Sequence, residues 1–221
     1  DDLTSLTVSV RIDNFATAAV SVTGTDTLST SAAGVLSGTA SGTTVSFTNT
    51  PGAATALTVN GLSADAITVV EAAGDITLGT VTAAGNLTVT ATAGSILDDG
   101  AATVITGATV TLNAGTAIGA AGAGAIDTTA GTINAAASAG SVTLTETDGA
   151  TLGTVTAAGA GNDVTIVSTA GDLTVQTVTA PDVVTLTATA GSVLDDGAAT
   201  VITAGMVTLN AGTAIGAAGA G

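Results

Sequence analysis

A long internal repeat constrains the fold of this chain more than any other feature. Residues 66–124 recur at 163–221, displaced by 97 positions, and residues 91–124 differ from residues 188–221 at only four of 34 positions. Self-similarity at a fixed period is typical of repeat architectures, in which each unit packs against its neighbours. Because residue 221 corresponds to a position inside the first unit, we expect the repeats to belong to a longer repetitive protein.

A shorter period lies within this unit. A small residue, a glycine and then Asp, Ser or Thr recur at a nearly constant interval in both copies. These glycines are Gly74, Gly94 and Gly115 in the first copy and Gly171, Gly191 and Gly212 in the second. We interpret them as corners, so that the displacement of 97 residues contains about five coils of 19 to 20 residues.

Apolar and polar residues alternate between these corners. Residues 86–90 read Asn-Leu-Thr-Val-Thr, and residues 184–187 read Val-Thr-Leu-Thr. Strict alternation of β-branched residues is typical of a strand with one buried face. Gly, Val and Thr form helices poorly, which argues against a helical repeat. We therefore expect Val, Leu and Ile inside and Thr outside.

The sequence predicts an all-β fold, a parallel β-helix or β-solenoid with coils of about 20 residues. The absence of Trp and Tyr, with only two Phe, fits a narrow interior. Tandem Ig-like β-sandwiches remain the alternative, because 97 residues is also a normal sandwich length. We divide the chain into divergent N-terminal coils or a capping module at 1–65, a first solenoid repeat at 66–162 and a partial second repeat at 163–221. In the first segment we expect strands at residues 6–12, 19–22, 44–47 and 56–59.

The charge of the chain excludes several classes of function. The chain contains seventeen acidic residues and one basic residue, Arg11, so its net charge is −16. Nucleic-acid binding needs Lys and Arg, so we expect no nucleic-acid partner, and no apolar run is long enough for membrane insertion. Without His, Lys, Cys or Tyr, the chain lacks most catalytic groups, and we expect no enzymatic activity and no cofactor.

Paired aspartates are the only candidate metal ligands. Asp98 and Asp99 precede Gly100, and Asp195 and Asp196 precede the equivalent Gly197. Carboxylates beside a glycine turn can bind Ca²⁺, which takes six to eight oxygen ligands. The same Asp-Gly sequence is also typical of a plain turn, in which Asp accepts hydrogen bonds from its own backbone. Both interpretations stay open at this stage.

Thr-x-Thr units recur along the expected strands. They occupy residues 80–82, 88–90, 109–111, 154–156, 177–179 and 185–187. A flat solenoid face of such units can order water and bind ice, but their spacing along the sequence is irregular, which favours an ordinary strand surface. Asn113 and Asn210 occupy matched positions, where we expect stacked asparagine side chains to form hydrogen bonds between neighbouring coils in a ladder.

The coil pattern resembles the repeats of filamentous-haemagglutinin-type proteins and related giant bacterial surface adhesins. Residues 94–96 (Gly-Ser-Ile) and 112–119 (Leu-Asn-Ala-Gly-Thr-Ala-Ile-Gly) carry the resemblance, as do residues 191–193 and 209–216. The resemblance implies a right-handed parallel β-helix exported to the surface of a prokaryotic cell.

These observations predict a structural component of an extracellular or cell-surface fibre, sheath or adhesin. We expect it to act by head-to-tail or lateral self-association, because open solenoid ends expose strand edges. The alternatives are an adhesin that binds a surface glycan or receptor, and an ice-binding repeat protein.

Overall fold

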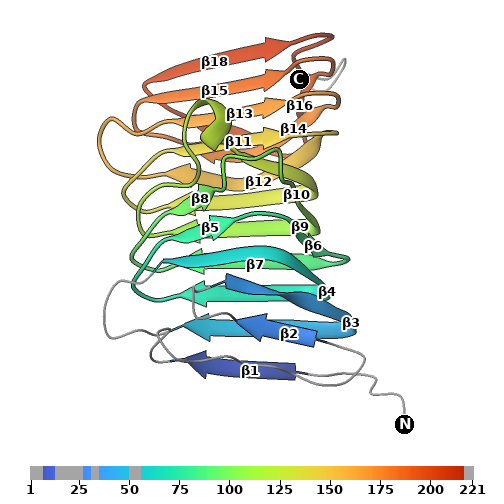
Figure 1. Cartoon of the computed structure of the whole chain (residues 1–221). Coiled ribbons are helices and arrows are strands. Elements are labelled where there is room, and N and C mark those ends of the chain that lie inside the picture. The colour runs from blue at the N-terminus through green and yellow to red at the C-terminus, as the bar shows by residue number, and fades with distance from the viewer. Residues whose placement is uncertain (1–6, 13–26, 31–34, 50–55, 217–221) are drawn as a thin grey trace.

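The chain folds into a stack of short parallel strands (Figure 1). The structure is a computed structural model, and it describes residues 7–12, 27–30, 35–49 and 56–216. Its described elements are strands and one 3₁₀ helix, η1 (Gly122–Gly124). The strands of the first half are β1 (Thr7–Ile12), β2 (Thr27–Thr30), β3 (Val35–Asn49), β4 (Leu57–Glu71), β5 (Ile76–Leu78), β6 (Val81–Ala83), β7 (Asn86–Ala91), β8 (Ile96–Asp98) and β9 (Ile105–Ala114). Those of the second half are β10 (Ile126–Ala137), β11 (Val142–Glu146), β12 (Ala150–Ala157), β13 (Val164–Ser168), β14 (Leu173–Thr179), β15 (Val183–Ala188), β16 (Val193–Asp195), β17 (Val201–Thr203) and β18 (Met206–Ala211).

Parallel pairing links each coil to the next. One column of paired residues runs through the stack with one member from each coil: Leu57, Ile76, Ile96, Ile118, Val142, Val164, Val184 and Val207. This arrangement, of about 7 turns with roughly 22 residues per coil, confirms the predicted β-solenoid. The Ig-like alternative is wrong, because it requires antiparallel sheets. Among the described strands only β2 pairs antiparallel, with β3.

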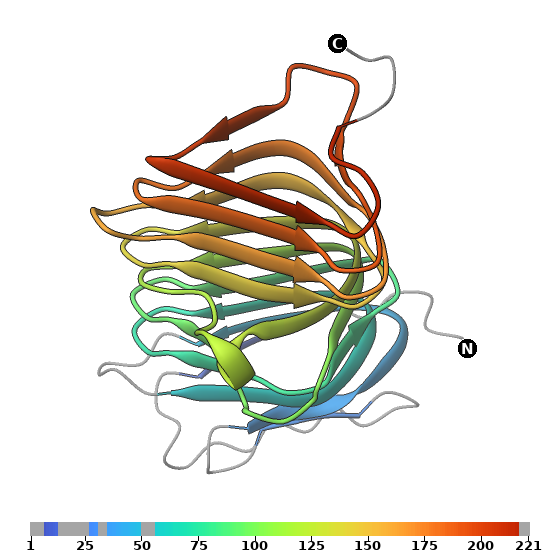
Figure 2. The ribbon, with the colours of Figure 1, turned by 90° about the horizontal axis from the view of Figure 1, so that it is seen from above.

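The alternation read from the sequence sets the inside and outside of the coil. In β7 and β13, for example, every second residue is buried. The buried residues are mainly Val, Leu, Ile and Ala, and they form one continuous core along the stack. Figure 2, in which the molecule is seen from above, shows the coils curving around this interior. Aromatic side chains are not needed because the interior is narrow, and Phe47 is the only one described there.

The predicted corner glycines lie where neighbouring coils touch through their backbones. A Cβ atom added at Gly94 would lie 2.2 Å from the carbonyl oxygen of Gly74, and one added at Gly191 would lie 2.3 Å from that of Gly171. Real Cβ atoms do not approach backbone atoms so closely. Glycine therefore recurs at this spacing because the backbones of stacked corners approach too closely for a Cβ atom.

The two copies of the repeat are turned relative to each other. Four coils separate Ile76 from Val164 along the paired column. Leu173, the copy of Ile76, follows later in the same coil as Val164 and pairs with Ala150 and Val193. The displacement between the copies thus spans about four and a half coils rather than five whole ones, since the coils around η1 are longer than the sequence period predicts.

Differences between the copies coincide with differences in strand breaks. Gly79 separates β5 from β6, whereas its copy Gln176 lies inside the continuous strand β14. Conversely, Gly107 lies inside β9, whereas its copy Ala204 lies in the break between β17 and β18, next to Gly205. Each of these two strand breaks thus contains a glycine, and the breaks fall at different positions in the two copies of the repeat.

The N-terminal segment joins the same stack. β1 and β3 pair in parallel, and β3 pairs in parallel with β4, which runs through residues 65 and 66 without a break. The strands expected at 6–12, 44–47 and 56–59 correspond to β1, the end of β3 and the start of β4. The strand expected at 19–22 lies outside the described residues.

Candidate functional site

Outward-facing threonines form columns along the stack. Strand pairing aligns residues that are unevenly spaced in the sequence, so that each coil contributes one hydroxyl to a column. The clearest columns are Thr143, Thr165, Thr185 and Thr208 on one face, and Thr109, Thr132, Thr151 and Thr174 on another. A third column is Ser63, Thr82, Thr106 and Thr129. The irregular spacing in the sequence therefore does not prevent a regular array.

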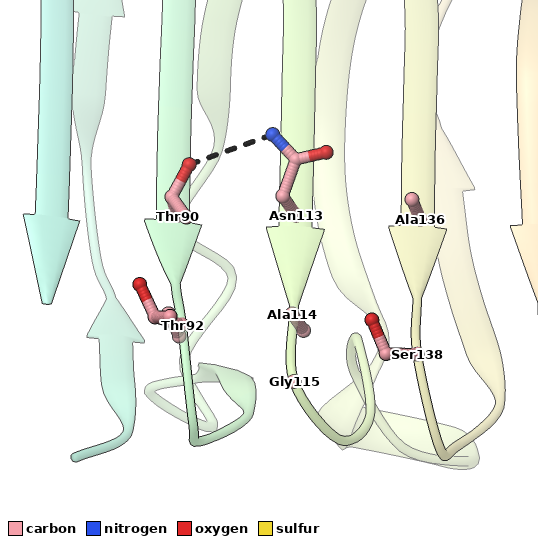
Figure 3. A pocket seen from close by; sticks show the side chains of 8 residues that line it. Thr90, Thr92, Asn113, Ala114, Gly115, Ala136 and Ser138 are labelled. Atoms are coloured by element: carbon pink, nitrogen blue, oxygen red, sulfur yellow. Dashed lines mark hydrogen bonds between the residues drawn. The ribbon is translucent and has the colours of Figure 1, made fainter. Parts of the chain in front are cut away.

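A shallow groove interrupts one of these outward faces (Figure 3). Asn113 donates a hydrogen bond from Nδ2 to the hydroxyl of Thr90 in the preceding coil, at 3.4 Å. The next position along this row is Ala136, whose short side chain leaves a hollow of about 210 Å³ between Thr92 and Ser138. The groove is uncharged, and its polar groups are hydroxyls and one amide.

The second copy repeats the interaction of Asn113. Asn210 donates from Nδ2 to the hydroxyl of Thr187 at 3.2 Å. The side-chain hydrogen bonds that the sequence predicts for these asparagines are therefore present, although their partners are threonines rather than stacked asparagines.

The paired aspartates form turns. Asp98 accepts a hydrogen bond from the Gly100 N–H at 2.7 Å, and Asp99 accepts one from the Ala101 N–H at 3.0 Å and one from the Thr103 hydroxyl at 2.7 Å. Gly100 has a φ of 77°, which suits the predicted Asp-Gly turn.

The second pair of aspartates has the same role. Asp195 and Asp196 accept hydrogen bonds from the Gly197 and Ala198 N–H groups. Within the described residues, three or more acidic side chains do not gather in a way that would hold a metal ion. The geometry thus gives all four aspartates a turn function, and calcium binding by Asp98, Asp99, Asp195 and Asp196 stays a prediction.

Burial raises the pKa of the Asp98 carboxyl, and the nearby charges of Asp99 and Asp127 raise it further. The hydrogen bond from the Gly100 N–H lowers it and opposes this shift. Asp98 lies in β8, which contacts β10 of the next coil, where Asp127 is located.

Acidic and amide side chains at other corners bind the backbone of the next coil. In each case a side-chain oxygen accepts a hydrogen bond from an N–H group 20 residues later, at 2.6 to 3.1 Å. The pairs are Asn60 with Thr80, Asp75 with Ser95, Asn134 with Thr154, Asp163 with Val183 and Asp172 with Ser192. Asp75, Asp163 and Asp172 therefore hold neighbouring coils together.

Two glutamates are buried inside the coil, which the sequence analysis missed. Glu71 and Glu146 are both 0% exposed, as are Thr128 and Ser168. Each glutamate is the last residue of a strand and occupies an inward-facing position of the alternation. The alternation along the strand could therefore have predicted that both are buried. At the equivalent corners, Glu71 accepts a hydrogen bond from the Gly74 N–H, and Ser168 accepts one from the Gly171 N–H.

Glu146 lies in a cage of hydrogen-bond donors. Its Oε1 accepts from the backbone N–H groups of Ala130, Thr147 and Asp148 at 3.4, 3.0 and 3.3 Å. Its Oε2 accepts from the hydroxyl of Thr128 at 2.5 Å. Burial is nevertheless the largest effect, and it raises the pKa of Glu146 to about 7. The hydrogen bond from the Thr128 hydroxyl lowers this pKa, whereas the side chain of Asp148 raises it further.

The C-terminal edge of the stack exposes apolar side chains. Among the described strands β18 pairs with β15 alone, and the large apolar residues most exposed in the described chain lie in β17, in β18 and shortly after β18. These are Val201 (47%), Met206 (56%), Val207 (44%) and Ile215 (56%). Figure 1 shows β18 at the end of the stack opposite to β1.

No described segment forms a helix long and apolar enough to cross a membrane.

Comparisons with known proteins identify no relative of this chain. No protein-family model matches the chain, and no curated protein or solved structure matches it either. The candidate sites are therefore the threonine columns, the groove above Ala136 and the apolar C-terminal edge, and their chemistry alone bears on function.

Proposed function

We propose that this chain is a structural component of an extracellular cell-surface fibre, sheath or adhesin and that it acts by self-association. The observation that carries this proposal is the parallel stacking of the coils, in which each strand adds to the edge of the strand in the coil before it. An uncovered strand edge is a template for pairing with another chain.

Several further features support a mechanical role. The interior is a continuous aliphatic core, and the corners are joined from coil to coil by side-chain and backbone hydrogen bonds. The resemblance of the corner motifs to filamentous-haemagglutinin-type repeats favours a location outside the cell, and the net charge of −16 favours solubility between assembly events.

We expect the purified chain to associate as its concentration rises, because pairing covers the apolar edge. Small-angle scattering over a concentration series should give an increasing mass and an elongated particle. Val207→Lys places a charge on the edge and should shift the particles toward monomers. The matched control is Thr208→Lys, which adds the same charge on the outward face of β18 and should leave association unchanged.

The series is repeated with millimolar calcium, which tests whether divalent cations offset the net charge and strengthen association. A particle that stays monomeric at every concentration, with and without calcium, would contradict the proposed function.

The aligned threonine columns favour ice binding as a second candidate function. Strands lie about 4.8 Å apart and alternate residues about 6.6 Å apart along a strand, so neighbouring columns form a regular array of hydroxyls. The column from Thr143 to Thr208 has a threonine in each of four coils. The neighbouring column, two residues further along each strand, has Val167 and Asn210 in place of two threonines.

The second candidate predicts thermal hysteresis and faceted ice crystals. Thr165→Lys, in the middle of the threonine column that starts at Thr143, should abolish both effects. Thr189→Lys, at an exposed corner, should leave both effects unchanged. Ice that grows unshaped in solutions of the unmodified chain would eliminate this candidate.

A further inference from the structure

One asparagine of the described chain, Asn86, does not help to hold the stack together through its side chain. The other asparagines whose side chains are described each form a hydrogen bond to a neighbouring coil or within their own turn. These are Asn60, Asn113, Asn134, Asn162 and Asn210. The side chain of Asn86 takes part in no hydrogen bond within the described residues, and it is exposed at the start of β7. Its amide is therefore accessible to a group from outside the chain.

The second copy of the repeat shows that the fold does not need an asparagine at this position. Val183 occupies the equivalent position, and it begins β15 as Asn86 begins β7. The two strands have the same length, and both pair in parallel with the next coil. Asn86 thus differs from its copy in chemistry while the backbone around it stays the same.

Asn86 belongs to the tripeptide Asn-Leu-Thr, which is an acceptor sequence for N-linked glycosylation. No other asparagine of the sequence has Ser or Thr two residues after it. Alternation along β7 places Asn86 and Thr88 on the same outward face, whereas Leu87 between them is buried. The amide and the hydroxyl that define the acceptor sequence therefore project together from the surface.

Small residues surround this amide. Ala84 and Gly85 precede Asn86 at the corner, and Thr109 pairs with it in the next coil. Ala108, which precedes Thr109, is exposed as well. None of these side chains is larger than threonine, so they leave room for a sugar on Asn86 to extend into solvent.

We propose that Asn86 is the acceptor of an N-linked glycan. In the reaction Nδ2 of Asn86 forms a bond to the anomeric carbon of a sugar carried by an activated glycosyl phosphate donor. The bond between that carbon and the phosphate oxygen breaks, the phosphate leaves with the electron pair, and the amide loses one proton to a base of the glycosyltransferase. The inference does not rest on self-association, because it requires only that the chain meets such an enzyme.

Peptide mapping of the protein isolated from the cells that produce it tests this inference. Cleavage before aspartate releases residues 75–97, in which Asn86 is the only asparagine, and residues 99–126, in which Asn113 is the only one. We expect the glycan on the first peptide and none on the second. An amidase specific for N-linked glycans should remove it and leave a carboxylate in place of the Asn86 amide. This step distinguishes a glycan on Asn86 from sugar on one of the threonines.

Two variants of Thr88, made in the same cells, test the role of the acceptor sequence. Thr88→Val keeps a similar shape on the outward face but lacks the hydroxyl, and it should abolish the modification. Thr88→Ser keeps the hydroxyl and should retain the glycan. A peptide of residues 75–97 that carries no glycan in the unsubstituted protein would overturn the inference. So would a glycan that persists in Thr88→Val, or one that occupies Asn113 as fully as Asn86.

Discussion

Replacing Glu146 with glutamine is expected to stabilise the protein by about 3 kcal/mol above pH 7 and to change its stability little below pH 4.5. The pKa of this buried carboxyl is raised from 4.5 to about 7, so the folded state favours the protonated form. Each unit of pKa corresponds to about 1.4 kcal/mol. Below pH 4.5 the carboxyl is protonated in both the folded and unfolded states, and burial has no ionisation penalty.

As the pH rises from 4.5 through 7, the unfolded chain ionises first, and the folded state loses stability until Glu146 is ionised in both states. Glutamine copies the protonated carboxyl: its oxygen accepts from the Thr147 and Asp148 N–H groups, and its amide donates to the Thr128 hydroxyl. That hydroxyl already lies 3.2 Å from the carbonyl oxygen of Thr145, to which it can donate instead.

Urea unfolding at a series of pH values measures this difference. The control is Asp182→Asn, which also removes one negative charge but from an exposed position, and which should change stability by less than about 0.5 kcal/mol. Wild-type and Glu146→Gln proteins with parallel pH profiles between pH 4.5 and 8 would show that the buried carboxyl does not titrate as described.

Replacing Gly171 with alanine is expected to destabilise the protein by about 3 kcal/mol, at the upper end of the usual range for overpacking. The added Cβ would lie 1.8 Å from the carbonyl oxygen of Asp148 and 2.5 Å from its carbonyl carbon. Both are backbone atoms of the neighbouring coil, so relief requires moving one corner away from the next. Such a shift weakens the hydrogen bonds between the two corners, which run from the Ala170 N–H to the Thr147 carbonyl oxygen and from the Ala150 N–H to the Asp172 carbonyl oxygen.

Two control variants separate steric overlap from other effects of the substitution. Ala170→Ser changes the exposed neighbouring residue and should be nearly neutral. Gly197→Ala has no atom within 4 Å of the new Cβ but a φ of 79°, so only backbone strain of about 1 kcal/mol is expected. If Gly171→Ala is no worse than Gly197→Ala in urea unfolding, close stacking of the corners does not explain the glycine period.

Much of the local structure follows from short sequence patterns. Alternation in residues 86–90 and 184–187 predicted strands and their buried faces, and both are confirmed in β7 and β15. The glycine period predicted corners, and Gly94 lies directly against the Gly74 backbone. These predictions succeed because a strand's inward and outward faces, and the close approach that only glycine permits, depend on a few neighbouring residues.

The candidate sites were predicted less well. The adjacent aspartates Asp98 and Asp99 suggested a calcium site, yet their oxygens accept hydrogen bonds from their own turn. Glu146 was not among the predicted sites, although alternation along the strand Val-Thr-Leu-Thr-Glu places it inward. Its donors Thr128 and Ala130 belong to the preceding coil, 18 and 16 residues away, and nothing local in the sequence indicates them.

The sequence by itself thus determined the β-solenoid class, the aliphatic interior, the glycine corners and the acidic exterior. Only the tertiary structure decided which residues of different coils lie side by side. Differences in length from one coil to the next accumulate along the stack, and together they turn the second copy by about half a coil and align unevenly spaced threonines. Val110 and Ile118 are buried because the next coil pairs with them through Ile133 and Val142. Local patterns fix the conformation of each strand, whereas its neighbours depend on every turn length before it.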